Sequence, residues 1–482
     1  MQINLKKLTY LPIIFLFLPA FSFYMPGLKS IYNFYYISLY VSLFIIVIFE
    51  HKYFINKIIS VCKKTPLIYF IIFLLFITIN SLLLALFGVT SIGPTLRSII
   101  MQLLLNIIPT IIYFIYIITR HIGLQRFIKI FMLFFWINLV LGIVAYIGRI
   151  YDISIINIIF DFLNNHRLLD MQYNGTAEQT SETYFITKRL CGLFEEPGYL
   201  GQFLFIFLPF VYTFACAKIQ VFKNKIFNKI FKNTLIPFTW INIILTLSPI
   251  TLVFASIITF LYYLKSIIYL IKKYYIIILG SIFAFIITIS SIDFSDTYIA
   301  RIINVITNIH SFEQFIIIEP SLATRVASYI NEFQIFLHHP FTGVGLGNLH
   351  SYMYNQYLNS PVLLTPEIIT RTNSSFLMGN DPMFNSGFMY SLLAEHGIFA
   401  YLILVFCYIK TFQYIINLHT FYNLNSYEYM LTKSLFYTLI CLLILSIYNL
   451  SLLSQYLHLL IALCSICIYE HKTRIMEEEV DA

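Results

Sequence analysis

Charged residues are scarce in this chain. Asp, Glu, Lys and Arg together make up only 11% of its 482 residues, whereas 59% are hydrophobic and the mean hydropathy is +0.82. A water-soluble protein of this length could not bury so much apolar surface. The composition therefore excludes an ordinary soluble enzyme or binding module and indicates a protein whose solvent is lipid.

Cysteine is scarce too, and its placement excludes two kinds of site. Of the seven cysteines, only Cys191 falls in a long polar segment, so no disulfide is available within those segments. Cys464 and Cys467 form a CxxC pair without a second pair, and we interpret them as packing inside an apolar helix. The chain has no HExxH motif and no convincing internal repeat. We expect neither a metal nor a cofactor.

Long apolar runs are what the chain has instead. A helix of about 20 apolar residues crosses ~30 Å of hydrocarbon, so we predict an all-α polytopic membrane protein. No short apolar segment with a small-residue cleavage site precedes the first run, and we expect that run to be retained. The twelve predicted transmembrane helices lie near residues 8–25, 31–50, 66–88, 97–119, 127–148, 198–217, 235–248, 249–266, 274–292, 386–409, 431–449 and 451–469.

Basic residues predict how these helices are oriented. With the N-terminus inside, 21 of the 30 Lys and Arg residues face the cytoplasm, in agreement with the positive-inside rule. Basic loops beside an anionic leaflet also account for the pI of about 8.9, so we expect no nucleic-acid partner. The chain then divides into helices one to five (1–148), a first outer loop (149–197), helices six to nine (198–292), a larger and partly helical outer loop (293–385), and the last three helices with a cytoplasmic tail (386–482).

The basic residues predicted to lie outside differ in kind from those inside. The cytoplasmic side has 18 Lys and 3 Arg, whereas the outer side has 2 Lys and 7 Arg. Topology alone does not favour arginine, but a guanidinium grips phosphate or carboxylate through two parallel hydrogen bonds. The bias favours an anionic ligand on the outer side. The alternative is that individual arginines pair with nearby acidic residues.

The larger outer loop contains the stretch SLATRVASYINEFQIFLHHPFTGVGLGN at 321–348. Its spacing predicts a helix with Thr324 as N-cap and with Arg325, Ser328 and Glu332 on one side. The face predicted to pack against the protein consists of Val326, Ile330, Phe333 and Leu337. Upstream, residues 297–318 carry an apolar stripe that predicts a helix along the membrane surface.

Pro340 and the glycines at 343, 345 and 347 are predicted to end this helix in a tight turn. A GxGxG pattern is also found in dinucleotide-binding loops. Here it follows a helix rather than a strand and faces a compartment without nucleotides, so we reject a dinucleotide-binding loop.

Three stretches carry a resemblance to a known family: RLCGLFEEPGYLG at 189–201, the segment at 321–348, and NSGFMYSLLAEHGIFAYLIL at 385–404. They resemble the O-antigen polymerase and ligase superfamily of membrane glycosyltransferases. In that family one arginine precedes a G-x-F-x-E-P element, a second precedes a glycine-rich loop, and an L-x-E-x-G-I element opens the next span. The motifs occur here in the expected order and at the expected membrane face.

The resemblance implies a polymerase of undecaprenyl-diphosphate-linked oligosaccharide repeat units at the periplasmic face of the bacterial inner membrane. It implies that Arg189 and Arg325 neutralise the diphosphate and that Glu195 and Glu196 lie beside the acceptor hydroxyl. The alternative for the glutamates is a structural one. Pro197 suits the first turn of a helix, whose dipole stabilises nearby acids and makes them poorer bases.

The expected substrate-binding residues are Gly343, Gly345, Gly347, His339 and Asn385. For the histidine, a simple surface position is the alternative. Glu395 falls inside a predicted span, and we expect it to pair with a neighbouring helix rather than take part in the chemistry.

One departure from the family pattern bears on the subfamily. Ligases, which transfer the glycan to lipid A core, carry a His-Asn pair at the positions that Ser386 and Gly387 occupy here. The missing histidine favours a polymerase. A flippase for the same lipid-linked oligosaccharides is an alternative of another class, but it would place charges near the middle of its helices. The expected partners are the lipid-linked oligosaccharide, the bilayer and a chain-length regulator protein.

Overall fold

The computed structural model describes residues 9–13, 34–151, 153–155, 190, 197–216, 220–246, 248, 251–264, 266, 268–269, 320–359, 388–422, 426–448 and 455–481. Within these residues every regular element is a helix, and no strand occurs. The prediction of an all-α protein is confirmed for the described part of the chain.

The N-terminal half of the described chain is a nearly continuous series of helices. They are α3 (Phe34–Lys64), α4 (Leu67–Leu86), α5 (Ile92–Ser98), the π-helix η2 (Ile99–Ile107), α6 (Ile108–Ile117), the π-helix η3 (Ile118–Ile122) and α7 (Leu124–Ile150). From α5 to η3 the chain stays helical throughout, so the span predicted at 97–119 lies within one long helical segment.

The C-terminal half has two shorter helices between long ones. Its helices are α11 (Pro197–Cys216), α12 (Lys225–Leu245), α16 (Pro320–His338), α17 (Leu349–Asn359), α19 (Phe388–Phe421), α20 (Tyr427–Tyr448) and α21 (Gln455–Asp481). Residues 251–264 form a further helix. α16 and α17 both lie in the predicted outer loop 293–385, which is therefore partly helical.

Six helices in the described residues are long and apolar enough to cross a membrane. They cover 37–64, 67–86, 92–122, 124–148, 388–421 and 427–447, and shorter apolar helices cover 200–216 and 251–264. By the length and composition of its helices, the chain is thus a multi-pass membrane protein. The total of twelve spans stays a prediction, because the predicted span 274–292 and most of 8–25 lie outside the described residues.

Several helices extend beyond the spans that hydropathy predicts. α3 continues past residue 50 to Lys64 through a kink at Glu50, and α12 begins ten residues before its predicted span. The start of α12 is capped by Asn224, whose side-chain oxygen accepts a hydrogen bond from the Ile226 N–H at 2.8 Å. Hydropathy marks only the apolar part of a helix. A helix continues through Lys and Glu, which are good helix formers, until a capping or breaking residue ends it.

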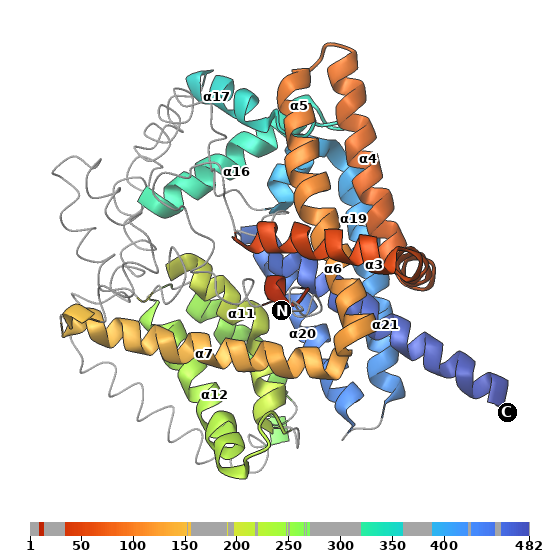
Figure 1. The fold of residues 1–482 in the computed structure, drawn as a ribbon. Helices are drawn as coiled ribbons and strands as arrows, with labels where there is room; N and C mark the ends of the chain where they lie inside the picture. The colour runs from red at the N-terminus through yellow and green to blue at the C-terminus, as the bar shows by residue number, and fades with distance from the viewer. Residues whose placement is uncertain are drawn as a thin grey trace.

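The long helices form two neighbouring groups (Figure 1). In one, α19 contacts α4 and α20, and α21 contacts α6; in the other, α11 contacts α12 and α20. Aromatic rings join α7 to α11, with the centroids of Phe131 and Phe207 only 4.5 Å apart. α16 and α17 lie beside the ends of α5 and α19 (Figure 1), and this end of the bundle contains the candidate site.

Candidate functional site

The structure describes only part of the predicted site. Arg189, Glu195, Glu196 and Asn385 lie outside the described residues, so their predicted roles stay predictions. α11 does begin at Pro197, the helix start predicted from the sequence. The remaining predicted site residues are Arg325, His339, Gly343, Gly345 and Gly347, and the structure places all of them on α16 or in the turn that follows it.

α16 begins earlier than predicted. Its first residue is Pro320, so the prediction of Thr324 as N-cap is wrong, and Thr324 is a buried residue in the second turn. The reason is the proline itself. Its fixed φ suits the first helical position, where the missing N–H costs nothing.

The predicted packing face of α16 is also wrong. Ser328, Asn331 and Glu332 are buried, whereas Ile330, Phe333 and Leu337 are exposed. The periodicity rule assumes that water surrounds the protein and that apolar residues therefore face its interior. In a membrane protein lipid is as apolar as leucine, so the polar side of a helix can face the protein instead.

The buried side of α16 is held by hydrogen bonds to α17. The Asn331 side-chain amide donates to the Met353 carbonyl at 3.1 Å, and the Tyr357 hydroxyl donates to Ser328 Oγ at 3.3 Å. Burial raises the pKa of Tyr357 to about 12. Its hydroxyl therefore stays protonated at physiological pH and remains a donor. Together with the buried apolar cluster that includes Ala327, Ile335 and Met353, these hydrogen bonds fix how α16 is oriented.

Arg325 lies at the edge of this polar side. It is half-buried, and it precedes Ser328 and Glu332 by about one and two helical turns. One turn further along the same side, Tyr329 stacks on Tyr390 of α19 with ring centroids 4.8 Å apart. The guanidinium is therefore carried by a helix whose orientation is set by both α17 and the first turns of α19.

The turn after α16 depends on its three glycines. Gly343, Gly345 and Gly347 have φ values of +63°, +77° and +81°, a region that other residues rarely adopt. A Cβ on Gly343 would overlap the backbone of Glu395, and one on Gly347 would overlap Ser98 Oγ and lie 2.7 Å from the Pro94 carbonyl oxygen. The glycines thus allow both the turn and its close approach to α5 and α19.

α19 receives this turn at a break in its own backbone. Gly397 has φ +72° and ψ −175° within the helix. The carbonyls of Ala394 and Glu395 accept hydrogen bonds from the N–H groups of Val344 and Gly345 at 3.0 and 2.7 Å, and the Ile398 N–H donates to the Pro340 carbonyl at 2.8 Å. The turn therefore supplies partners for the backbone groups that the break leaves without their usual helical ones.

Glu395 completes this attachment with its side chain. Its Oε1 accepts a hydrogen bond from the Gly347 N–H at 3.0 Å. We expected this glutamate to pair with a neighbouring helix, and the structure shows its side chain bonded to the glycine turn. The fully buried His396 lies beside it, with Nε2 3.7 Å from Glu395 Oε2.

Polar residues of α4 and α5 hold the other side of the turn, and the sequence analysis did not identify them. The Ser81 hydroxyl accepts a hydrogen bond from the Leu346 N–H at 2.9 Å, the Asn80 amide donates to the Thr342 carbonyl at 2.7 Å, and the Asn348 amide donates to Thr95 Oγ1 at 2.9 Å. The adjacent Asn and Ser inside an apolar run were the available signal, because buried polar groups in a membrane helix need partners.

His339 lies between α16 and the turn. The imidazole is half-buried and meets the Tyr352 ring edge-on, with centroids 5.4 Å apart. Burial lowers the pKa of His339, and the neighbouring His338 lowers it further. The neutral imidazole is therefore favoured near pH 7, and in that form it can both donate and accept a hydrogen bond.

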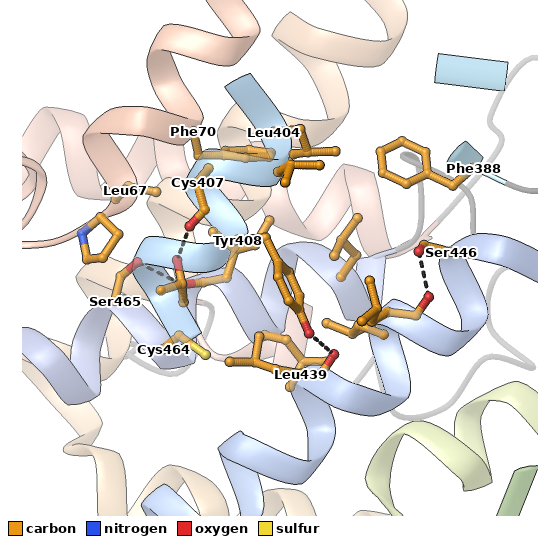
Figure 2. Close-up of a pocket in the computed structure, with 18 of the residues that line it drawn as sticks. Leu67, Phe70, Phe388, Leu404, Cys407, Tyr408, Leu439, Ser446, Cys464 and Ser465 are labelled. Atoms are coloured by element: carbon orange, nitrogen blue, oxygen red, sulfur yellow. Dashed lines mark hydrogen bonds between the residues drawn. The ribbon is translucent and has the colours of Figure 1, made fainter. Parts of the chain in front are cut away.

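A cavity of about 270 Å³ lies between α4, α19, α20 and α21. Figure 2 shows its lining, which is mostly Leu, Ile and aromatic side chains. The hydroxyls of Ser446, Ser465 and Thr411 donate to backbone carbonyls at 2.7, 2.8 and 2.9 Å, and that of Tyr408 donates to the Leu439 carbonyl. With these polar groups already bonded, the cavity suits a hydrocarbon chain rather than a sugar.

The cavity and α16 meet the same short segment of α19. Phe388, Met389 and Leu392 line the cavity, whereas Tyr390 stacks on Tyr329 of α16.

Cys464 lines the cavity and is buried, as is Cys467. Among the described residues, no three His, Cys, Asp or Glu side chains come together in a way that could hold a metal ion.

No protein-family model matches the chain, and no curated protein or solved structure is detectably similar to it. The resemblance to the polymerase and ligase superfamily therefore stays a prediction from the three motifs.

Proposed function

We propose that this chain is a polymerase of undecaprenyl-diphosphate-linked oligosaccharide repeat units and that its active site faces the periplasm at the bacterial inner membrane. The observation that carries the proposal is the setting of Arg325. The guanidinium is half-buried at the end of a membrane helix bundle, on a helix fixed by polar contacts to α17 and by stacking on α19. A guanidinium held in this way suits a phosphate anion, which accepts two parallel hydrogen bonds.

The proposed reaction is glycan transfer between two carrier lipids. The acceptor hydroxyl attacks the anomeric carbon of the donor glycan, and the bond from that carbon to the diphosphate oxygen breaks. Negative charge develops on the leaving diphosphate, where Arg325 and Arg189 stabilise it. In this proposal Glu196, with Glu195 beside it, takes the proton of the acceptor hydroxyl. No nucleotide sugar is needed, because the lipid diphosphate is the leaving group.

The apolar cavity supports a lipid-linked substrate. A diphosphate carrier has a long hydrocarbon chain, and the cavity offers about 270 Å³ lined by apolar side chains. The first turns of α19 contact both the cavity and the helix that carries Arg325. In our proposal, the glycine turn and His339 bind the sugars, and Asn385 contributes to the same site.

The test is an assay of the purified protein in proteoliposomes with carrier-linked repeat units. A polymerase makes chains of more than one repeat, and Arg325→Lys loses most of that product. Transfer to lipid A core in place of chain growth would identify a ligase, whereas translocation of an unchanged substrate would identify a flippase. In cells, a polymerase restores long chains to a polymer-negative strain only when a separate ligase is present.

A further inference from the structure

α16 exposes an apolar edge that none of the residues described by the structure covers. Ile330, Phe333 and Leu337 are 39%, 46% and 60% exposed, and they follow one another at intervals of three and four residues, which places them on one side of the helix. We call these three residues the α16 apolar edge. The opposite side of the helix is buried and includes the polar residues Ser328, Asn331 and Glu332, so the larger apolar side chains of the edge point outward.

The neighbouring α17 shows the reverse pattern. Its exposed residues include Ser351, Asn355 and Asn359, which are spaced four residues apart and form a polar edge. The two helices pack against each other through Asn331 and the Met353 carbonyl. The exposed surfaces of this pair are therefore suited to different surroundings, one apolar and the other aqueous.

The apolar surface continues from α16 onto a membrane-spanning helix. Beyond Leu337, Phe341 is 62% exposed and stacks on Phe399 of α19, which is 51% exposed, with ring centroids 5.9 Å apart. Further along α19 the exposed apolar residues recur at three- and four-residue intervals at Leu402, Phe406 and Ile409. α19 is long and apolar enough to cross the membrane, so this face of α19 contacts lipid.

We infer that α16 is a membrane-surface helix whose apolar edge lies in the hydrocarbon of the leaflet where α19 begins. Continuity selects lipid over other partners, because the edge is followed by the exposed Phe341, which stacks on Phe399 of the lipid-facing side of α19. Ser328 and Asn331, polar residues of α16 that could otherwise contact water, are buried and hydrogen-bonded to α17. This matches helices that lie in the interface with one apolar side among the acyl chains.

This placement has a consequence for Arg325. A helix that lies along the surface keeps its axis at one depth, and Arg325, which is not part of the apolar edge, lies about 12 Å along that axis from Phe333. Its guanidinium is therefore at the level of the lipid headgroups, where the phosphates of membrane lipids are found. The inference about α16 stands on exposure and packing, and it does not depend on the proposed polymerase activity.

The experiment places a photoreactive benzoylphenylalanine at Leu337 or at Asn355 in the full-length protein. The protein is reconstituted in nanodiscs of phosphatidylethanolamine and phosphatidylglycerol, irradiated and analysed by mass spectrometry. We expect phospholipid adducts at position 337. At position 355, which lies on the polar edge of α17, we expect none. The same label at Phe333 provides a second position in the edge if the first variant is poorly produced.

The inference is overturned if labels at both 337 and 333 give no lipid adduct, or if they crosslink to a second protein chain. Equal lipid labelling at 337 and 355 would also overturn it, because the two helices would then not differ in their surroundings. None of these readouts uses glycan transfer, so the result stands apart from the fate of the proposed function.

Discussion

Two glycines with a positive φ, one in the turn after α16 and one after α4, differ in why they are needed. Gly347 and Gly88 both have positive φ, +81° and +72°. A Cβ on Gly347 would overlap Ser98 Oγ, whereas a Cβ on Gly88 would meet nothing within 4 Å. This pair separates the cost of the backbone conformation from the cost of crowding.

We predict that Gly347→Ala lowers the free energy of unfolding more than Gly88→Ala does. Both substitutions cost about 1–2 kcal/mol for the left-handed backbone, and Gly347→Ala adds ~1–3 kcal/mol for the crowded contact. The apparent melting temperature in detergent measures the difference. Equal decreases in the two variants would show that the turn does not approach α5 as closely as described.

Arg325 carries the prediction about charge geometry. Arg325→Lys keeps the positive charge but loses the two parallel donors of the guanidinium. We expect a loss of about 2–4 kcal/mol of transition-state stabilisation, or ~30- to 1000-fold in the rate of chain extension. The protein should reach normal levels in the membrane, because the residue is not in the apolar core.

Arg371→Lys, in the same predicted loop but outside any motif, is the control for that variant and should be almost as active as the parent protein. The measurement is the chain-length distribution on a gel beside an immunoblot for protein amount. Full-length polymer from Arg325→Lys at normal abundance would show that Arg325 does not grip phosphate through two hydrogen bonds.

His339 makes stability depend on pH. Its pKa is lowered by burial and by His338, so the folded protein binds a proton less readily than the unfolded chain does. Stability is then highest at pH values above the ordinary histidine pKa of about 6.5 and falls as pH drops from there towards the lowered pKa. We expect His339→Gln to lose less melting temperature than the parent between about pH 8 and about pH 5. Identical losses in the two proteins would contradict this.

At the level of elements, the glycine turn joins the bundle by entering the break in α19. The Glu395 side chain is part of this joint, because its Oε1 accepts the Gly347 N–H. We predict that Glu395→Ala destabilises the protein by about 1–3 kcal/mol, since the part-buried Gly347 N–H loses its acceptor. Glu395→Gln keeps a carbonyl oxygen at that place and should cost less than half as much. Thermal unfolding of both variants tests this, and equal losses would mean that the negative charge matters rather than the hydrogen bond.

The elements also show what the sequence could and could not predict. The helix at α16 and the turn at its end were predicted, because Pro340 and the glycines are strong local signals. The buried face of α16 was predicted wrongly, because periodicity shows which side is apolar but not whether lipid or protein meets it. The break at Gly397 was not predicted, since its cause is a turn about 50 residues earlier in the chain.

At the scale of the whole molecule, composition alone predicted a helical membrane protein, and the helix lengths agree with it. The ends of the helices were predicted less well. α21, for example, continues to Asp481, and its C-terminal part extends away from the bundle (Figure 1). Hydropathy shows which residues prefer lipid to water, whereas helix ends depend on local capping and breaking residues. The end of an apolar run and the end of a helix therefore need not coincide.

Orientation in the membrane is the last prediction. The lysine-rich run from Lys218 to Lys232 should face the cytoplasm, because basic loops are retained on that side. α17, with its polar edge, should face the periplasm. Lys225 and Asn355 are both exposed, so cysteines at these positions should react with a thiol reagent wherever it has access. In a background that carries both Cys191→Ser and Cys216→Ser, an impermeant maleimide should label Asn355→Cys in intact spheroplasts and Lys225→Cys only after permeabilisation. The reverse pattern would invert the topology and place Arg325 on the cytoplasmic side, where the proposed polymerase would have no translocated substrate.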